Sequence, residues 1–329
     1  MRLSVLVVSR TAEFLNEFLS SIANATTLEA TEVEILCSWN GSNEEQEKIH
    51  NSSGYEFLIA NRDSYHFATN INALAKKANG EIILIINDDI LLDSCSIDEA
   101  ITCLCNEKEA GLVGARLRNQ TGALTHAGIV FDYRNSPYHQ LDRLVDSELK
   151  NLINQNLVMP AVTGAFMLLK KEIFLELKLN EEYKVCGEDV ELCLNIRQKF
   201  ALKIFYCPRA SGIHEMESTR KTSPNQEGND EDLTRLRMIR SQFLQNANTN
   251  QLLDEIYAQS RESSILRSIA TGDLPPSQAN EIMKNHEKET KNWQAKFHAL
   301  QLNRLEQEQK LASLTKEISN LKRSKEKEI

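Results

Sequence analysis

Acidic residues interrupt an apolar segment in the first third of the chain. In "IINDDILLD" a run of isoleucines ends at Asn87, Asp88 and Asp89, and the chain then becomes apolar again. Carboxylates are costly beside an apolar core unless something compensates them. A hard divalent cation, Mg²⁺ or Mn²⁺, does so through oxygen ligands while it also binds a substrate diphosphate. The alternative is an acidic turn at a solvated sheet edge.

A second pair of acids begins the segment "EDVELCLNIRQKF", whose apolar spacing predicts a helix over 188–200. Glu188 and Asp189 stand at its start, where unpaired amides and the helix dipole favour negative charge. Capping would explain them structurally. A carboxylate kept ionised at a cleft edge can also take a proton from a hydroxyl, so both acids are candidates for a general base.

The loop "SGIHEMESTR" holds a third set of reactive side chains, among them His214 and Arg220. A single histidine in a loop is usually structural or merely exposed. His214 is a candidate because a loop that follows a terminal strand can fold over the same sheet end as Asp89.

These residues need a scaffold, and the first half of the chain predicts one. Helical patterns at 12–22 and 67–78 alternate with short apolar runs at 3–9, 32–39, 55–60 and 81–87. Strands buried on both faces that alternate with helices indicate an α/β fold, a Rossmann-like and mostly parallel sheet flanked by helices. Ligands of such sheets bind beyond the carboxyl ends of the strands, where the acidic triplet falls.

The second half continues the alternation. Apolar segments predict further strands at 111–117, 160–169 and 202–207. Ser96 and Glu99 have the spacing of a capping box for a helix that ends near residue 107.

From residue 222 the composition becomes that of a polar linker, and a helical region follows. We expect a catalytic domain at 1–228 and a helical extension at 229–329, with a break at 271–277. A coiled coil is predicted at about 290–325, although a solitary helix or one folded onto the domain fits too. Its seam alternates steps of four and three through Trp293, Phe297, Leu300, Arg304, Gln307, Leu311, Leu314, Ile318 and Leu321. We expect this extension to mediate self-association and to be dispensable for the chemistry.

Composition narrows the class of protein. The 329 residues are 41% hydrophobic and 26% charged, as in soluble globular proteins. The net charge of −9 argues against a general nucleic-acid-binding protein. No apolar run approaches the roughly 20 residues of a membrane span, and "MRLSVLVVSR" is expected to form a strand and not a signal peptide. Seven cysteines without a CxxC pair favour free thiols and a cytoplasmic location.

The order of these pieces resembles glycosyltransferase family 2, enzymes of the GT-A fold, and particularly its bacterial rhamnosyltransferase-like members. The resemblance covers residues 1 to about 225. Each fragment alone is weak, but their collinear order is specific. The segments are "VLVVSRTAEFLNEFLSSI", "SWNGSNE", "IINDDILL", "AGLVGARLRNQTGALTHAGIVFD", "AVTGAFMLLKKEIF", "GEDVELCLNIR" and "HEMESTR".

The resemblance implies an inverting hexosyltransferase that uses a nucleotide-diphosphate sugar and a divalent cation. Asp89 matches the last acid of the family's metal motif, His214 its late metal-site histidine, and Asp189 its base, with Glu188 beside it. Gly164 falls on the acceptor side. The residues that the resemblance places on the donor side are Ser9, Arg10, Trp39, Asn40, Asn72, Asp88 and Arg220.

One departure from the family pattern leaves the donor open. The family usually has an acid before the Asn-Gly-Ser turn that follows its second strand, and this chain has Trp39. Trp39 could stack on a nucleobase, but an indole cannot accept a hydrogen bond from a pyrimidine imide.

Two other classes of protein remain open. A nucleotidyltransferase would need a Gly-rich loop for a triphosphate, and "SRTAEFLNE" has no glycine. A degenerate transferase could serve as a coiled-coil scaffold, which Trp39 and the long tail favour and the intact acids oppose. By family analogy, the acceptor would be a glycan or lipid-linked glycan at the cytoplasmic membrane face, with peripheral membrane contact.

Overall fold

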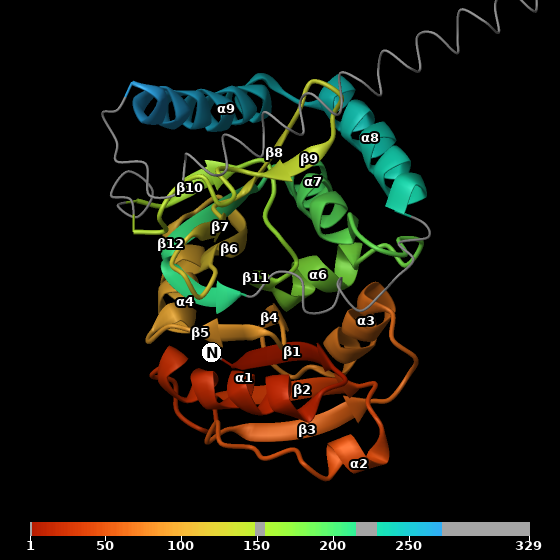
Figure 1. Cartoon of the computed structure of the whole chain (residues 1–329). Coiled ribbons are helices and arrows are strands. Elements are labelled where there is room, and N and C mark those ends of the chain that lie inside the picture. The colour runs from red at the N-terminus through yellow and green to blue at the C-terminus, as the bar shows by residue number, and fades with distance from the viewer. Residues whose placement is uncertain (1, 149–154, 215–228, 272–329) are drawn as a thin grey trace, which may run out of the picture. The chain divides into compact units, whose positions relative to one another are not determined.

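The computed structural model describes residues 2–148, 155–214 and 229–271 (Figure 1). In these ranges ten strands form one sheet and two short strands form another. The elements up to the acidic triplet are β1 (Leu3–Ser9), α1 (Ala12–Ala25), β2 (Val33–Trp39), α2 (Asn43–Gln46), β3 (Glu56–Asn61), α3 (Phe67–Lys77) and β4 (Ile82–Asn87). The elements after it are β5 (Ile90–Leu92), α4 (Ser96–Asn106), β6 (Ala110–Arg118), β7 (Leu124–His126), β8 (Ile129–Phe131), β9 (Pro137–His139), β10 (Leu157–Met159), β11 (Phe166–Lys170), α6 (Lys171–Leu177), α7 (Glu188–Phe200), β12 (Lys203–His214), α8 (Asn229–Asn246) and α9 (Thr249–Ala270).

The main sheet is mixed and mostly parallel, which confirms the predicted fold class. Its strand order is β10-β12-β6-β11-β4-β1-β2-β3, with β5 on β12 and β7 on β6. Strand β1 runs parallel to β2 and β4, and β6 runs parallel to β12. Strand β11 lies antiparallel between β4 and β6. The carboxyl ends of β1, β2 and β4 therefore meet at one edge.

The two faces of the sheet each bury a hydrophobic core, because side chains alternate along a strand. Leu3, Val5 and Val7 of β1 belong to the core cluster that includes α1 and α4, whereas Leu6 and Val8 belong to the cluster on the other face, which includes α3, α6, α7 and α8. This layering explains why the early strands are apolar throughout. It leaves the strand ends as the place for polar side chains.

The predicted elements up to about residue 107 agree with the structure, apart from one helix start. Ser96 is not a cap: Cys95 occupies the N-cap position with a φ of 60°, and no side chain caps the helix there. The Ser96 hydroxyl instead donates to the carbonyl oxygens of Asp93 and Ser211 at 2.7 and 2.6 Å. The capping-box prediction was wrong because Ser96 is buried against β12.

The strand predicted at 160–169 is only partly present. Residues 160–165 lie between β10 and β11, and the strand starts at Phe166. The preceding residues form a loop whose backbone faces α7, since the Gly164 amide bonds the side chain of Asp189.

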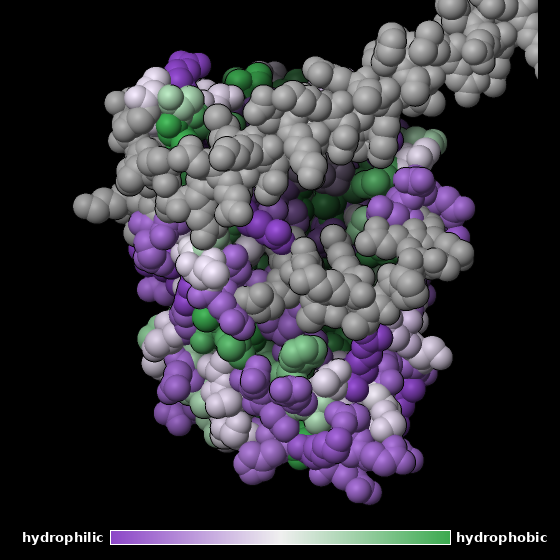
Figure 2. Space-filling model, in the orientation of Figure 1, coloured by the Kyte–Doolittle hydropathy of each residue, from purple (hydrophilic) through white to green (hydrophobic). Residues whose placement is uncertain are grey.

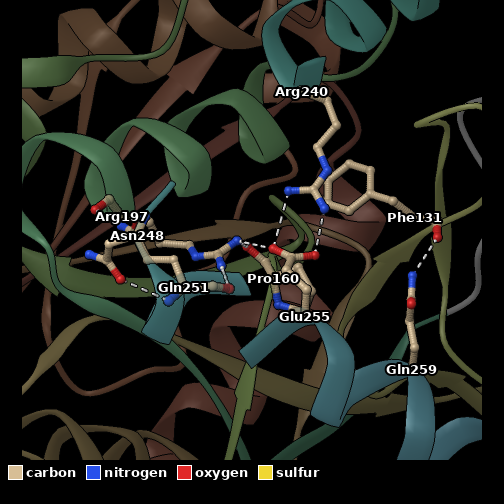
Figure 3. A network of polar contacts seen from close by, with 8 residues as sticks. All are labelled: Phe131, Pro160, Arg197, Arg240, Asn248, Gln251, Glu255 and Gln259. Carbon is tan, nitrogen blue, oxygen red and sulfur yellow. Dashed lines mark hydrogen bonds and ion pairs between the residues drawn. The ribbon is translucent and has the colours of Figure 1, made fainter. Parts of the chain in front are cut away.

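Helices α8 and α9 pack on the sheet domain through buried charges (Figure 3). Glu255 of α9 accepts from Arg197 of α7 at 2.5 Å and from Arg240 of α8 at 2.6 and 3.1 Å. These three side chains are at most 8% exposed. Arg240 also lies over the ring of Phe131, 4.1 Å from its centroid. The described residues up to Thr271 fall in one compact unit, and the predicted coiled coil at about 290–325 lies outside the described residues.

The surface of the described part is mixed in polarity. In Figure 2 the region around α2 and β3 is mainly hydrophilic, with hydrophobic residues in separate patches. Among the helices that the structure describes, none has both the length and the apolar character to cross a membrane.

Candidate active site

The carboxyl ends of β1 and β4 lie side by side, because the two strands are parallel, and a pocket is present there. Val8 lies opposite Asn87, so Ser9 and Arg10 stand beside the acids that follow β4. The pocket has a volume of about 240 Å³. Its lining residues are Val8, Ser9, Arg10, Thr11, Phe14, Tyr65, Phe67, Asn87, Asp88 and Asp89.

Asp88 is held in a strongly perturbed environment in this pocket. Burial above all, with the negative charge of Asp89 acting in the same direction, raises the pKa of Asp88 to about 6. A hydrogen bond with the Ser9 hydroxyl and the charge of Arg10 act in the opposite direction. Two neighbouring carboxylates repel each other when both are ionised, and a bound cation would offset this repulsion.

Asp89 and His214 meet at the same edge, as the sequence predicts. Strand β5 turns back and pairs with the end of β12, so that Ile90 lies opposite His214. The His214 Nε2 atom is 3.2 Å from Asp89 Oδ1, and the two side chains are 12% and 11% exposed.

Asp89 and His214, the two candidate metal ligands, suit a cation that also binds phosphate oxygens. One carboxylate and one imidazole suit Mn²⁺, which accepts both ligand types, and such cations complete their coordination with phosphates and water. No group of three or more His, Cys, Asp or Glu that could hold a metal ion occurs within residues 2–148, 155–214 and 229–271. A site built on Asp89 and His214 would therefore depend on the diphosphate for further ligands.

Asp189 lies at the start of α7 against Gly164. The Gly164 amide donates to Asp189 Oδ2 at 2.7 Å, and the Val190 amide donates to Oδ1 at 2.7 Å. A Cβ at position 164 would lie 3.2 Å from the Asp189 Cβ, so the small residue permits this close approach. The two amides fix the orientation of the carboxylate, and a carboxylate has about four lone-pair positions with which to accept protons.

The acids that follow β4 and Asp189 of α7 lie at the same end of the sheet. The Asn87 amide donates to the Ala165 carbonyl at 3.1 Å, and the adjacent Gly164 amide donates to Asp189. Phe67, which lines the pocket, would lie 3.5 Å from a Cβ at Gly164. The structure thus brings together most of the residues that the sequence singled out.

Trp39 is placed differently from the sequence expectation. Its side chain is 2% exposed and belongs to the core between the sheet and α1. Its Nε1 donates to the Ser42 carbonyl at 3.4 Å, and Gly41 lies against the ring. A buried ring offers no face to a nucleobase, which corrects the proposed stacking role. The backbone N–H of the neighbouring Asn40 donates to the Ser9 carbonyl at 2.8 Å, so Asn40 remains beside the pocket.

Asn72 supports a loop and does not reach the pocket. Its Nδ2 donates to the Leu179 carbonyl at 2.8 Å and to Glu181 at 2.9 Å, while its Oδ1 accepts from the Leu179 amide at 3.0 Å. The side chain is 3% exposed. Its hydrogen-bonding groups are used in the fold, so the donor-binding expectation for Asn72 is corrected. Arg220 lies outside the described residues.

His126 is a residue of this region to which the sequence gave no role. It ends β7, is 1% exposed, and its Nδ1 lies 3.0 Å from Nδ1 of His139. Its Nε2 accepts from the Thr163 amide at 3.4 Å, next to the Gly164 amide that binds Asp189. Burial first, then the charges of His139 and His214, hold the pKa of His126 well below its ordinary value.

The buried His126 should make stability depend on pH. An unfolded histidine gains a proton as the pH falls through its ordinary value of 6.5, whereas folded His126 does not. Stability should therefore decline below pH 6.5 by about 1.4 kcal/mol per pH unit from this group. Urea unfolding at pH 7, 6 and 5 should show a smaller loss for His126→Asn than for the parent. Exposed His50→Asn is the control, and equal slopes for the parent and His126→Asn would contradict the assignment.

Comparison with known proteins gives a family and a fold. A region of "O-antigen biosynthesis protein RfbC" from Myxococcus xanthus is 29% identical over 157 residues, which is 46% of this chain and 12% of that protein. This chain therefore corresponds to a small part of that relative's length.

Two solved structures share the fold at low identity. The mannosyltransferase PcManGT from Pyrobaculum calidifontis, in complex with GDP-Man and Mn²⁺, has a TM-score of 0.51 and 14% identity over 87% of this chain and 79% of that one. GalNAc-T7, with UDP, GalNAc and Mn²⁺, also has a TM-score of 0.51 and 14% identity, over 65% of this chain and 44% of that one.

The family assignment rests on a longer match. The sequence model "Glycosyl transferase family 2" matches residues 4–177, a span that includes β1 to β11 and α6. Because this span is more than half of the chain, the protein belongs to glycosyltransferase family 2.

Proposed function

We propose that this protein is an inverting glycosyltransferase that moves a sugar from a nucleotide-diphosphate sugar to an acceptor hydroxyl. The narrower part of the proposal is a hexose-type donor sugar, in line with the rhamnosyltransferase-like sequence pattern. The observation that carries the proposal is the position of Asp189. Its carboxylate is oriented by two backbone amides at the same sheet end as Asp89 and His214.

In this proposal Asp189 is the general base. The Gly164 and Val190 amides hold the carboxylate with both oxygens fixed, so that it can take the proton of the incoming hydroxyl. Attack from the face opposite the diphosphate breaks the bond to the leaving oxygen in one step and inverts the anomeric centre. Glu188, one residue earlier at the start of α7, is proposed as the second acid of the site.

Asp89 and His214 are proposed to hold a divalent cation, Mn²⁺ or Mg²⁺. When bound, such an ion supplies positive charge that offsets the charge on the leaving diphosphate. The perturbed Asp88 beside them supports the choice of a cationic ligand. Both similar solved structures carry Mn²⁺.

The donor would lie over the ends of β1 and β4. Arg10 offers a positive charge to a phosphate, Ser9 and Asp88 line the same pocket, and Asn40 adjoins it. The proposal does not specify which nucleobase the donor carries. The buried Trp39 does not replace the missing acid, and the two similar structures carry GDP and UDP groups.

The proposed acceptor is a glycan or lipid-linked glycan, and the setting is surface-polysaccharide synthesis at the cytoplasmic face of the membrane. The support is the name of the Myxococcus relative. Self-association through the coiled coil predicted at about 290–325 is also part of the proposal.

A degenerate, non-catalytic scaffold is the second candidate, favoured by the loss of the family's base-reading acid at Trp39. A nucleotidyltransferase is less well supported, because the loop from Ser9 to α1 has no glycine to wrap a triphosphate. A thermal-shift screen of nucleotide sugars with and without Mn²⁺, followed by assays of transfer and donor hydrolysis, distinguishes the three. A ligand of the native state raises the melting temperature, and a scaffold would show neither a shift nor turnover.

Asp89→Asn should weaken nucleotide binding only when Mn²⁺ is present. Loss of partners beyond the first coordination sphere typically costs about 10- to 100-fold in metal affinity, so loss of a direct ligand should cost at least that. Calorimetric titration with the identified nucleotide, in Mn²⁺ and in EDTA, measures the difference. Glu81→Gln is the matched control, because Glu81 is exposed and directly precedes β4, at the end of the strand away from Asp89. Equal Mn²⁺-dependent affinity in Asp89→Asn and the parent would refute the cation site.

A further inference from the structure

The segment that leads into α7 is held by a carboxylate of the C-terminal helices. Asp232, in the first turn of α8, is 2% exposed. Its oxygens accept from three successive backbone amides, those of Lys184, Val185 and Cys186, at distances of 2.7–3.2 Å. We propose that Asp232 is a positioning residue for Asp189.

The link from these amides to Asp189 is short and stiff. Only Gly187 and Glu188 separate Cys186 from Asp189. Gly187 has a φ of +117°, and a Cβ there would lie 2.7 Å from the Tyr183 ring and 3.3 Å from Leu236 of α8. The turn is therefore packed against α8, and a shift of the amides would be passed to the start of α7.

The other side of the segment is fixed by α3. Nε2 of His66 lies 2.8 Å from the Tyr183 carbonyl oxygen, and Asn72 bonds both backbone groups of Leu179. Residues 179–187 are thus held between α3, which belongs to the sheet domain, and α8. Of the contacts from α3 and from α8, those of Asp232 lie closest in the chain to Asp189.

The orientation of Asp189 needs this precision because its Oδ2 must meet the Gly164 amide, 2.7 Å away, on another element. Displacement of a catalytic group by about 1 Å can lower a rate about 10²-fold. The inference rests on the proposed role of Asp189 as the base. A purely structural Asp232 would instead stabilise the fold and leave the turnover of folded protein unchanged.

Asp232→Asn tests the inference, because an amide replaces one accepting oxygen with a donor that faces other donors. Glu231→Gln is the matched control, since Glu231 makes an exposed ion pair with Lys184 at 2.8 Å. Hydrogen exchange should be about 10- to 100-fold faster at the amides of residues 184–186 in Asp232→Asn only. The kcat for sugar transfer should fall about 10²-fold, while the donor KM stays within about twofold.

A second variant covers the case in which Asp232→Asn does not fold. Asp232→Glu keeps the charge but adds one methylene, and it should lower kcat in the same direction without changing donor KM. Unchanged exchange at 184–186 in a folded variant, or a normal kcat despite faster exchange, would overturn the positioning role. If the parent protein transfers no sugar, the proposed function fails, and the exchange measurement alone still decides whether Asp232 holds the segment.

Discussion

Asp189→Asn should lower sugar transfer by roughly 10²–10⁴-fold, the usual contribution of a positioned general base. Asparagine keeps the size of the side chain, and the N-cap position of α7 belongs to Gly187 and not to residue 189, but an amide cannot accept the proton. Donor binding should be unchanged, because the proposed donor residues lie at the carboxyl ends of β1, β2 and β4 and not on α7. Steady-state transfer and nucleotide affinity, measured on one preparation, test both statements.

The stability of Asp189→Asn must be measured beside its activity. The parent carboxylate accepts two amides, from Gly164 and Val190, and an asparagine can satisfy one of them with its single oxygen. We expect a loss of about 1 kcal/mol in the free energy of unfolding. Near-normal transfer by folded Asp189→Asn would reject Asp189 as the base, and Glu188 or Glu191 would become the next candidate.

The sequence could predict the fold and the position of most candidate residues for one physical reason. Parallel strands have their carboxyl ends at one edge, so Asn87–Asp89 and Ser9 had to meet once β1 and β4 were recognised. The same reasoning placed His214 at this edge, although the sequence predicted a strand at 202–207 with His214 in the loop after it, whereas β12 continues to His214 and pairs there with β5. Asp189 needed the family pattern as well, because the sequence of α7 alone is explained by capping.

The sequence could not distinguish side chains that bind a ligand from those that bind the protein. Trp39 and Asn72 are residue types common in binding sites, yet the ring is buried in the core and the amide is used by the loop at Leu179. Their partners are distant in the chain. Asp232 is the opposite case: a first-turn acid of an ordinary-looking helix accepts three amides some 46–48 residues earlier.

The same limit applies to the domain boundary. The polar composition near residue 228 predicts a linker, and the expectation that everything after about 230 is dispensable followed from it. The contacts of Asp232 and Glu255 argue otherwise for α8 and α9. We propose that the catalytic unit extends to about Thr271 and that only the remaining tail is separable.

Glu255→Ala should destabilise the protein by about 3–5 kcal/mol, because it leaves Arg197 and Arg240 buried without their common partner. The two guanidinium groups are 2% and 4% exposed, and burial already lowers the pKa of Arg240. Chemical unfolding monitored by far-UV circular dichroism measures the loss. A surface pair provides the matched control: Glu176→Ala breaks the half-exposed pair with Lys199 and should cost at most about 1 kcal/mol.

A triple variant separates the need for charge from the need for packing. Replacing Arg197 and Arg240 by methionine and Glu255 by leucine removes every buried charge of the network (Figure 3). A buried ion network exchanged for apolar side chains of similar volume is often neutral or stabilising, so this variant should regain much of the stability that Glu255→Ala loses. A loss below about 1 kcal/mol in Glu255→Ala would mean that α9 is not anchored through these charges. Failure of the triple variant to recover stability would instead assign the anchor to the hydrogen bonds that Arg197 makes with the carbonyls of Pro160 and Gln251.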